Sequence, residues 1–364
     1  MIDAFRSYLP VDVHFGCGAL SELPDLLSSI GSDAMVLVCD RFFADFGAEL
    51  QKKTPAIAAV FSDVEPNPQL SGVETVVQLL KATGATAVAA IGGGSAIDTA
   101  KFAAACAFSD RTPAEHFDGA PFPKAHAAII AVPTTAGTGS EVTGVSVISR
   151  GSEKKTTHNP AFYPTACIVD PELTFTVPAK TTLMTGLDAF THAIEAFWSV
   201  NHTPVTDLFA VEALKAIVPH LEASYKTGDK DARVAMAYGS LMAGLAFSTA
   251  KTAACHACSY PLSSYHHLPH GEACAFTLDS FIRLNADDRL EELAWTLGFE
   301  SCDELANEIA RLKREGGLRT RLADLDGNAD IDRLAKESNA HMLMRNNPVQ
   351  FTDEALRAMF AALE

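Results

Sequence analysis

Short apolar runs alternate with helical patterns along the first half of the chain, and this alternation constrains the fold more than any other feature. The runs are β-branched or rich in alanine, and each ends in polar residues or glycine, as expected for strands buried in a sheet. Strand–helix alternation of this kind predicts βαβ units and a mostly parallel sheet covered by helices. We predict strands at 35–39, 57–61, 87–91, 127–132 and 167–169, with helices that include 70–83 and 95–108.

The patterning changes after Asp170-Pro171-Glu172-Leu173. Before this point, a polar stretch at 142–155 predicts a hairpin insertion, whereas almost everything after Pro178 has helical periodicity. Because 364 residues are enough for two domains, we expect an α/β dinucleotide-binding domain over 1–177 and an all-α domain over 178–364. The predicted helices of the second domain lie at 185–200, 204–223, 231–250, 290–297 and 303–316.

The composition excludes several classes of protein. Lys and Arg number 28 against 45 Asp and Glu, and the net charge of −17 argues against a nucleic-acid partner. Neither an apolar run of about 18 residues nor a signal peptide occurs, so we expect no membrane segment. The eight cysteines lie mostly in apolar runs, which favours reduced thiols in a cytoplasmic protein. Cys255 and Cys258 form a C-x-x-C without a second pair, and we interpret both as apolar fillers.

A glycine-rich turn follows the predicted strand at 87–91. Gly92, Gly93 and Gly94 would let backbone N–H groups approach an anion closely, and Ser95 is expected to cap the following helix. The N-terminus of a helix adds unpaired N–H groups and the positive end of a dipole, which suits a pyrophosphate. The turn is not a G-x-G-x-x-G fingerprint, so a tight turn without a ligand is the alternative.

Two more polar features follow predicted strands. Thr134, Thr135 and Thr138 lie in a loop rich in glycine and hydroxyl groups, which either binds ribose and phosphate or is a flexible surface loop. Asp40 ends another strand, where a carboxylate accepts hydrogen bonds from a ribose 2′-OH and repels a 2′-phosphate. It therefore favours NAD(H) over NADP(H), unless Asp40 is a helix cap or a solvated residue.

One carboxylate and three imidazoles form a candidate metal-binding set: Asp188, His192, His256 and His270. Asp188 and His192 are four residues apart in a largely apolar segment, so on a helix they share a face that should be buried. Burying a carboxylate without a partner is costly, and a shared cation would remove that cost. The set suits Fe(II), Zn(II) or another divalent first-row ion, in a closed structural site or in a catalytic one that adds a substrate oxygen. With the glycine turn, it predicts a metal-dependent, nicotinamide-linked oxidoreductase.

With these residues in hand, the chain resembles the iron-containing (group III) alcohol dehydrogenase family, whose fold is shared with dehydroquinate synthase and glycerol dehydrogenase. The matching motifs span nearly the whole chain: FGCG at 15–18, NP at 67–68, GGGSAIDTAK at 92–101, PTTAGTGSE at 133–141, DPEL at 170–173, the Asp188/His192 segment and PHG at 269–271. The resemblance implies an N-terminal NAD(P) domain, a helical C-terminal domain, one divalent metal held at the four positions above, and a homodimer or larger assembly. It also implies nicotinamide-side contacts near the three threonines, and we add Asn67 and Asp98 to the expected cofactor site.

One position departs from the family pattern. The family usually has a second histidine four residues after the one at His256, often assigned to a proton relay, and this chain has Tyr260 instead. A tyrosine can donate a hydrogen bond, but its pKa is about 10 unless a neighbouring cation lowers it. His267 or its neighbour His266 is an alternative relay, unless both are surface loop residues.

The residues around this departure resemble a subgroup, the phosphonoacetaldehyde reductases, which make 2-hydroxyethylphosphonate. The similar segments are SYPL at 259–262, KT at 251–252 and NNP at 346–348. A phosphonate dianion needs cationic partners, and Lys251 and Arg345 are the candidates, unless both are solvated surface charges. Lys251 is also included with Tyr260 and His267 among the candidate catalytic residues.

The predicted function is NAD(H)-linked reduction of a short aldehyde by a metal-dependent enzyme. Phosphonoacetaldehyde is the first expected substrate, maleylacetate or a semialdehyde the next, and a simple alcohol–aldehyde pair the third. A lyase of the dehydroquinate synthase type would have a glutamate in place of Asp188 and more basic residues nearby. A non-catalytic protein would bind NADH and metal without turning over an aldehyde.

Overall fold

The computed structural model describes residues 4–151 and 153–363. The chain forms two compact units, one from Leu9 to Phe175, and the other from Thr176 onward together with the short N-terminal segment that ends at Tyr8. The first unit contains the sheets, and no strand occurs among the described residues of the second. This confirms the predicted α/β and all-α classes. We propose the domain boundary at about residue 177, close to this division.

Six parallel strands form the main sheet in the order β1-β8-β5-β4-β2-β3. The apolar runs predicted five of them to within a few residues. β1 was not predicted, because its sequence mixes polar and apolar residues and it lies, mostly exposed, at an edge of the sheet. The strands are β1 (Asp12–Phe15), β2 (Met35–Asp40), β3 (Ile57–Val64), β4 (Ala87–Gly92), β5 (Ala128–Pro133) and β8 (Ala166–Val169).

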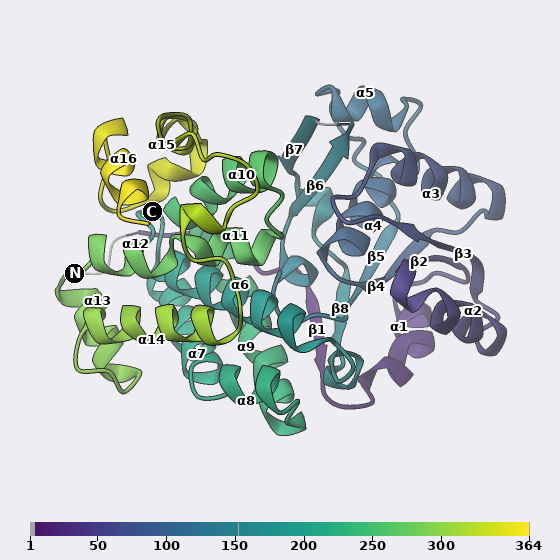
Figure 1. Ribbon diagram of the computed structural model, residues 1–364. Helices are drawn as coiled ribbons and strands as arrows, with labels where there is room; N and C mark the ends of the chain where they lie inside the picture. The colour runs from purple at the N-terminus through teal and green to yellow at the C-terminus, as the bar shows by residue number, and fades with distance from the viewer. Residues whose placement is uncertain (1–3, 152, 364) are drawn as a thin grey trace. The chain divides into compact units, whose positions relative to one another are not determined.

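Helices cover both faces of this sheet, with α1 and α2 on one face and α3 and α4 on the other (Figure 1). Alternate residues of a strand point to opposite faces, so the central strands are buried on both and read as continuous apolar runs. Leu23 and Leu27 of α1, for example, pack in one cluster with Leu37 and Ala89. The helices are α1 (Leu23–Ser29), α2 (Ala44–Lys53), α3 (Leu70–Thr83), α4 (Gly94–Cys106) and α5 (Pro113–Phe117), with 3-10 turns η1 (Ala19–Glu22), η2 (Arg41–Phe43), η3 (Ser140–Val142), η4 (Pro160–Phe162) and η5 (Pro171–Thr174).

The predicted hairpin insertion is present as two antiparallel strands, β6 (Val145–Arg150) and β7 (Glu153–His158). Its strands are not part of the main sheet. The backbone N–H of Ser149 donates to the carbonyl of Pro68 at 2.8 Å, and Lys101 of α4 donates to the carbonyl of Val145 at 2.9 Å. The hairpin is therefore fixed to the entry of α3 and to the helix that follows the glycine turn.

The second unit is built around α6, whose residues are buried on nearly every side. This helix contacts α7, α8, α9, α10 and α11, which explains why even its polar residues, such as Asp188, His192 and Glu195, are buried. No helix in the described ranges is long and apolar enough to cross a membrane. The helices are α6 (Ala179–Trp198), α7 (Pro204–Ile217), α8 (Leu221–Lys226), α9 (Lys230–Ala250), α10 (Ala254–His266), α11 (His270–Phe276), α12 (Leu278–Leu284), α13 (Asp288–Thr296), α14 (Cys302–Glu315), α15 (Ile331–Ala340) and α16 (Asp353–Ala361), with 3-10 turns η6 (Leu322–Asp324) and η7 (Met342–Asn346).

One predicted helix is wrong in its extent. The periodicity predicted a single helix over 204–223, but the structure has two, α7 and α8, with a break after Ile217. Pro219 lies in that break, where it lacks the N–H group that a continuous helix would need. The other predicted helices agree within a few residues, except that α6 begins at Ala179, six residues before the predicted start.

Candidate functional site

Helix α6 presents Asp188 and His192 one turn apart, as the spacing predicted. Both are buried, at 2% and 4% exposed. The Oδ1 atom of Asp188 has no hydrogen-bond partner among the described residues. Burial raises the pKa of Asp188 to about 7, while the charge of His256 acts in the opposite direction. An unpaired buried carboxylate oxygen is unusual, and a cation beside it would supply the missing partner.

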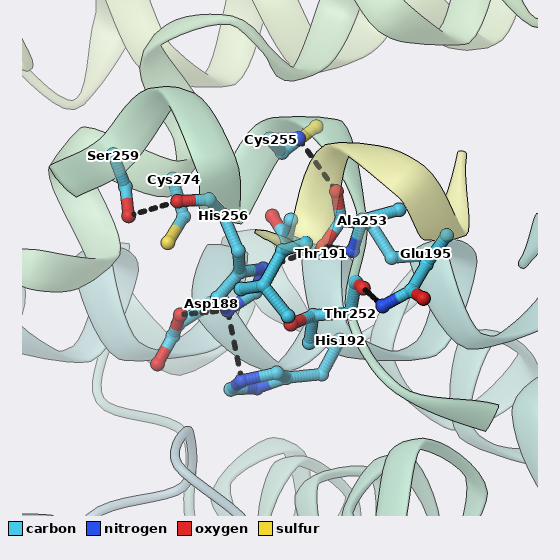
Figure 2. Close-up of polar contacts among 12 residues, drawn as sticks. Asp188, Thr191, His192, Glu195, Thr252, Ala253, Cys255, His256, Ser259 and Cys274 are labelled. Atoms are coloured by element: carbon cyan, nitrogen blue, oxygen red, sulfur yellow. Dashed lines mark hydrogen bonds and ion pairs between the residues drawn. The ribbon is translucent and has the colours of Figure 1, made fainter. Parts of the chain in front are cut away.

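Two further helices bring His256 and His270 to the same place. The Nε2 atom of His256, on α10, lies 3.0 Å from Nε2 of His192 and 3.9 Å from Oδ1 of Asp188 (Figure 2). Nε2 of His270, at the start of α11, lies 3.8 Å from the same oxygen. The structure thus brings the four residues of the predicted set close together: His256 and His270 lie around Oδ1 of Asp188, and His192 adjoins them through His256.

A glycine allows α11 to approach α6 this closely. A Cβ atom on Gly271 would lie 2.3 Å from the carbonyl oxygen of Met184 and 3.2 Å from Cβ of Asp188. No side chain fits there, because real Cβ atoms do not approach backbone oxygen so closely. The glycine after His270 therefore permits the helix contact that places this histidine beside Asp188.

Glu195 is a buried part of the site that the sequence reasoning missed. It lies two turns after Asp188 on α6 and is 0% exposed. The Nδ1–H group of His256 donates to its carboxylate at 2.6 Å, and the backbone N–H groups of Ala253 and Cys255 donate at 2.8 and 2.6 Å (Figure 2). This hydrogen bond orients the ring so that Nε2 of His256 points towards His192 and Asp188, where it can bind a metal ion in place of a proton. The available signal was a second acidic residue in the same apolar run.

Cys274 also lies at this point and was not predicted. It is four residues after His270 on α11 and is 0% exposed. Ligand atoms of Asp188, His256, His270 and Cys274 all lie within 4.8 Å of one another. The tightest group of possible donors among the described residues therefore contains this cysteine, while His192 adjoins the group through His256.

These residues fit a divalent cation. The unpaired oxygen of Asp188 would gain a partner, and the two Nε2 atoms 3.0 Å apart would share a ligand instead of facing each other. His192 is held for this by stacking on Phe247, with ring centroids 4.2 Å apart. A carboxylate and imidazoles, with a second carboxylate orienting one imidazole, form a ligand shell typical of iron or zinc sites.

The glycine turn and the threonine-rich loop of the first unit are in contact. They follow two neighbouring strands of the sheet, which brings them together. β4 pairs with β5, and the N–H of Thr134 donates to the carbonyl of Gly92 at 3.0 Å. A Cβ on Gly94 would lie 3.0 Å from the side chain of Thr138, and one on Gly93 would lie 3.6 Å from that of Thr135. Both loops thus follow the carboxyl ends of adjacent parallel strands, where α/β sheets bind ligands.

The cap of the helix after this turn differs from the prediction. Gly93, not Ser95, occupies the N-cap position of α4, and no side chain caps the helix. No side chain therefore competes with an anion for the N-terminus of α4, although the N–H of Ala96 already donates to the carbonyl of Gly93 at 3.1 Å. Asp40 ends β2 as predicted, and its carboxylate accepts from the N–H of Gly93 at 3.4 Å and from that of Phe43 at 3.2 Å. It both caps η2 and borders the glycine turn.

The last two expected cofactor residues have partners within the protein. Asp98 accepts from the Ser140 hydroxyl at 2.8 Å and from the N–H of Val147 at 2.9 Å, so it joins α4 to the threonine loop and the hairpin. Asn67 is exposed in a left-handed conformation with φ 58°, and it accepts from Lys154 at 2.9 Å. A direct contact of either residue with the cofactor stays a prediction.

Sequence profiles of one family match both units. The profile of the iron-containing alcohol dehydrogenases matches residues 10–171, and that of the C-terminal domain of the same family matches residues 182–363. The chain belongs to the iron-containing alcohol dehydrogenase family. It is therefore an oxidoreductase of the alcohol and aldehyde class.

Individual family members resemble the chain over nearly its whole length. Long-chain-alcohol dehydrogenase 1 of Geobacillus thermodenitrificans is 32% identical, with 98% of this chain and 96% of its own length covered. The sulfoacetaldehyde reductase of Bilophila wadsworthia is 29% identical, with 90% and 87% covered. Among solved structures, a sulfoacetaldehyde reductase from Bifidobacterium kashiwanohense in complex with NAD+ has a TM-score of 0.95 and 39% identity, with 99% of each chain covered.

The tyrosine that departs from the family pattern has a histidine beside it in this alcohol dehydrogenase. Tyr260 lies one turn after His256 on α10 and stacks on His341, with ring centroids 4.1 Å apart and planes 26° apart. The Nδ1 atom of His341 accepts from the N–H of Leu343 at 3.3 Å. Burial lowers the pKa of His341, and the charge of His256 lowers it further. This imidazole comes from a segment that the sequence reasoning did not consider.

The alternative relay residues after α10 differ from each other. His267 is exposed and ends the helix in a left-handed conformation with φ 53°. His266 is buried, and its Nδ1 lies 2.8 Å from the carbonyl of Asp326. His267 is therefore a surface residue, as the alternative interpretation expected, whereas His266 is not.

Lys251 and Arg345 lie on two segments that are joined by a hydrogen bond. Lys251 ends α9 with φ 67°, a backbone conformation that few residues other than glycine adopt. Its ammonium group donates to the carbonyl of Ser248 at 2.9 Å, and no acidic partner occurs within the described part of the chain. Burial lowers the pKa of Lys251. Arg345 is exposed, and the next residue, Asn346, donates to the carbonyl of Thr252 at 2.8 Å.

Proposed function

We propose that this alcohol dehydrogenase uses a nicotinamide cofactor and one divalent metal ion to reduce a short aldehyde that carries a tetrahedral anionic group. Phosphonoacetaldehyde, reduced to 2-hydroxyethylphosphonate, is the first proposed substrate. The observation that carries the proposal is the group of metal-binding side chains in the helical unit, in which a buried, unpaired oxygen of Asp188 lies near the buried His256 and the exposed His270.

The metal ion, when bound, supplies Lewis-acid polarisation of the aldehyde oxygen. Asp188, His192, His256 and His270 are the proposed ligands. Glu195 accepts a hydrogen bond from Nδ1–H of His256 and so keeps that proton on Nδ1, which leaves Nε2 as the nitrogen that would bind the metal. The donor types suit Fe(II) and Zn(II) alike, so the ion that is loaded depends on availability.

The cofactor is proposed to bind at the two loops of the first unit. The open N-terminus of α4 would hold the pyrophosphate, and Thr134, Thr135 and Thr138 would contact the nicotinamide side. We propose NAD(H) rather than NADP(H), because the carboxylate of Asp40 borders the glycine turn, where it would repel a 2′-phosphate. A bound NADH would supply the hydride for the carbonyl carbon, and a group of the protein would have to give one proton to the oxygen.

The proton donor is proposed to be Tyr260 with the stacked imidazole of His341. A phenol one turn after His256 shares the face of α10 that carries this ligand. The low pKa of His341 makes its protonated form a stronger acid than an ordinary imidazolium. His267 is the alternative donor from the sequence.

Lys251 is the proposed partner of the anionic group, with Arg345 as a second candidate. The ammonium group of Lys251 is partly buried on a strained backbone, and among the described residues its hydrogen-bond partner is a carbonyl, so it can also bind an anion. The resemblance to sulfoacetaldehyde reductases supports this class of substrate, since a sulfonate has the same tetrahedral shape as a phosphonate but one negative charge instead of two. Sulfoacetaldehyde is therefore the second candidate.

The test is to follow NADH oxidation by the metal-reconstituted enzyme with five aldehydes in parallel: phosphonoacetaldehyde, sulfoacetaldehyde, succinic semialdehyde, maleylacetate and propanal. We expect the highest kcat/KM for one of the two tetrahedral anions, and a Lys251→Met variant should lose this preference while it keeps its activity on propanal. Equal or better use of propanal by the parent enzyme would reject the substrate class and leave a general aldehyde reductase. NADH binding without any turnover would reject the reaction itself.

We also propose that the enzyme is a homodimer. Light scattering after size exclusion tests this directly, since a mass near 38.7 kDa would indicate a monomer.

A further inference from the structure

We propose that the sulfur of Cys274 is a further ligand of the metal ion, which gives the centre oxygen, nitrogen and sulfur donors. The sequence alone predicts that the cysteines are reduced thiols, mostly inside apolar runs. The structure places this one among the donor atoms of the centre, in the tightest group within the described ranges.

The position of Cys274 follows from helix periodicity. His270 and Cys274 are one turn apart on α11, as Asp188 and His192 are on α6, so each helix presents two donor side chains on one face. The Sγ atom lies 3.8 Å from Nε2 of His270. Figure 2 shows the cysteine beside Asp188 and His256.

The unpaired carboxylate oxygen is an independent sign that a ligand belongs at this point. Oδ1 of Asp188 is buried and accepts no hydrogen bond from the described residues, although the thiol of Cys274 interacts with the same carboxylate. A cation at the centre of the group would be within reach of this oxygen, the imidazoles and the sulfur, since their ligand atoms lie within 4.8 Å of one another.

The two cysteines of the C-x-x-C provide the contrast. Cys255 and Cys258 are also 0% exposed, but neither belongs to the group of donors. Cys258 has Ser338 and Thr277 as its polar neighbours instead. Burial alone therefore does not place a sulfur at the centre, and Cys258 is a matched control for Cys274.

Ligation by Cys274 would change the net charge of the metal centre and the metal ions that it prefers. As the metal–sulfur bond forms, the thiol loses its proton to solvent, and the thiolate together with the carboxylate of Asp188 balances the two positive charges of the ion. Thiolate is a soft ligand that favours zinc, cobalt and ferrous iron over manganese. The presence of Cys274 should therefore narrow the set of ions that bind tightly.

The decisive experiment is the near-ultraviolet and visible spectrum of the Co(II)-substituted full-length protein. A cobalt–thiolate bond produces an intense sulfur-to-cobalt charge-transfer band, which oxygen and nitrogen ligands do not. We expect this band in the parent protein and in Cys258→Ser, and its loss in Cys274→Ser and Cys274→Ala. Absence of the band in cobalt-loaded parent protein, or its persistence in both Cys274 variants, would overturn the proposal without affecting the proposed reaction.

A competition measurement extends the test to metal preference. The ratio of the Zn(II) to the Mn(II) dissociation constant should change by about tenfold or more in Cys274→Ser, towards manganese, and remain unchanged in Cys258→Ser. An unchanged ratio in Cys274→Ser would count against sulfur ligation. The inference rests on the metal site of the proposed function, so a parent protein that binds no divalent ion at all would refute both.

Discussion

Replacing Glu195 by glutamine tests how the site orients its metal ligands. The carboxylate accepts three hydrogen bonds, from Nδ1 of His256 and from the backbone of Ala253 and Cys255, and it is 0% exposed. A glutamine has one oxygen and one NH₂ group, so it cannot accept all three. If its NH₂ group faces His256, that imidazole carries its proton on Nε2 and no longer binds a metal. If its NH₂ group faces a backbone N–H group instead, two buried hydrogen-bond donors point at each other, at a cost of about 1–3 kcal/mol.

We therefore expect Glu195→Gln to weaken metal binding by about 10- to 100-fold, the usual effect of losing a partner that orients a ligand. This corresponds to about 1.4–2.7 kcal/mol. Glu195→Ala should lower the stability of the fold as well, by about 3–5 kcal/mol, because it leaves buried donors without any acceptor. The assay is competition for Zn(II) with a chromophoric chelator, followed by thermal unfolding of the metal-free and metal-loaded proteins.

Asp170→Asn is the matched control. Asp170 is also buried and accepts from three backbone N–H groups, those of Gly18, Leu20 and Glu172, but it contacts no proposed ligand. The control should lower the melting temperature and leave Zn(II) affinity unchanged. Parent-like metal affinity in Glu195→Gln would refute the argument that this carboxylate sets the tautomer of His256.

Four further predictions concern single positions. Gly271→Ala should lower both Zn(II) affinity and melting temperature, because the new Cβ would lie 2.3 Å from a backbone oxygen of α6. Asp40→Ser should raise the kcat/KM for NADPH relative to NADH by about tenfold, or about 1.4 kcal/mol, measured with one aldehyde. Tyr260→Phe should lower kcat by about 100-fold with unchanged metal content, whereas Tyr260→His should retain activity; equal activity of the phenylalanine variant would reject the tyrosine as donor. Burial raises the pKa of Glu141 from 4.5 to about 7, so its neutral form stabilises the fold at low pH and this contribution is lost as pH rises through about 7. Chemical unfolding of the parent and of Glu141→Gln should show that, between pH 5 and pH 8, the parent loses up to about 3 kcal/mol more of its free energy of unfolding than the variant. An equal pH dependence of the two proteins would contradict the raised pKa of Glu141.

Much of the α/β unit could be predicted because burial on both faces makes a strand apolar throughout. The runs that form β2, β4 and β5 are of this kind, and their predicted limits differ from the observed ones by only a residue. The exposed edge strand β1 lacks that signal. The break between α7 and α8 was missed, although Pro219 marks it, because the apolar periodicity continues across the proline.

The candidate site was predictable only where its residues are close in sequence or part of a motif. Asp188 and His192 stand out by their spacing, and His270 by the glycine that follows it. Contacts between distant segments could not be read this way, such as the stacking of His341 on Tyr260. Cys274 was overlooked for a different reason, since a cysteine in an apolar run is usually a filler and only the approach of α11 to α6 gives it donor neighbours.

The hydrogen-bond partners of a buried charged side chain show whether it supports the fold or is available to bind a ligand. Lys101 is 0% exposed, but it donates to Ser140, Thr143 and the carbonyl of Val145, so its charge is satisfied inside the first unit. Asp188 is as deeply buried, yet its Oδ1 accepts nothing from the described residues. A buried charge in a sequence is compatible with either role, and only the partners decide between them. Lys101 is therefore part of the scaffold of the cofactor loops, whereas the unpaired oxygen of Asp188 lies near the imidazoles of His256 and His270, where a cation would be its partner.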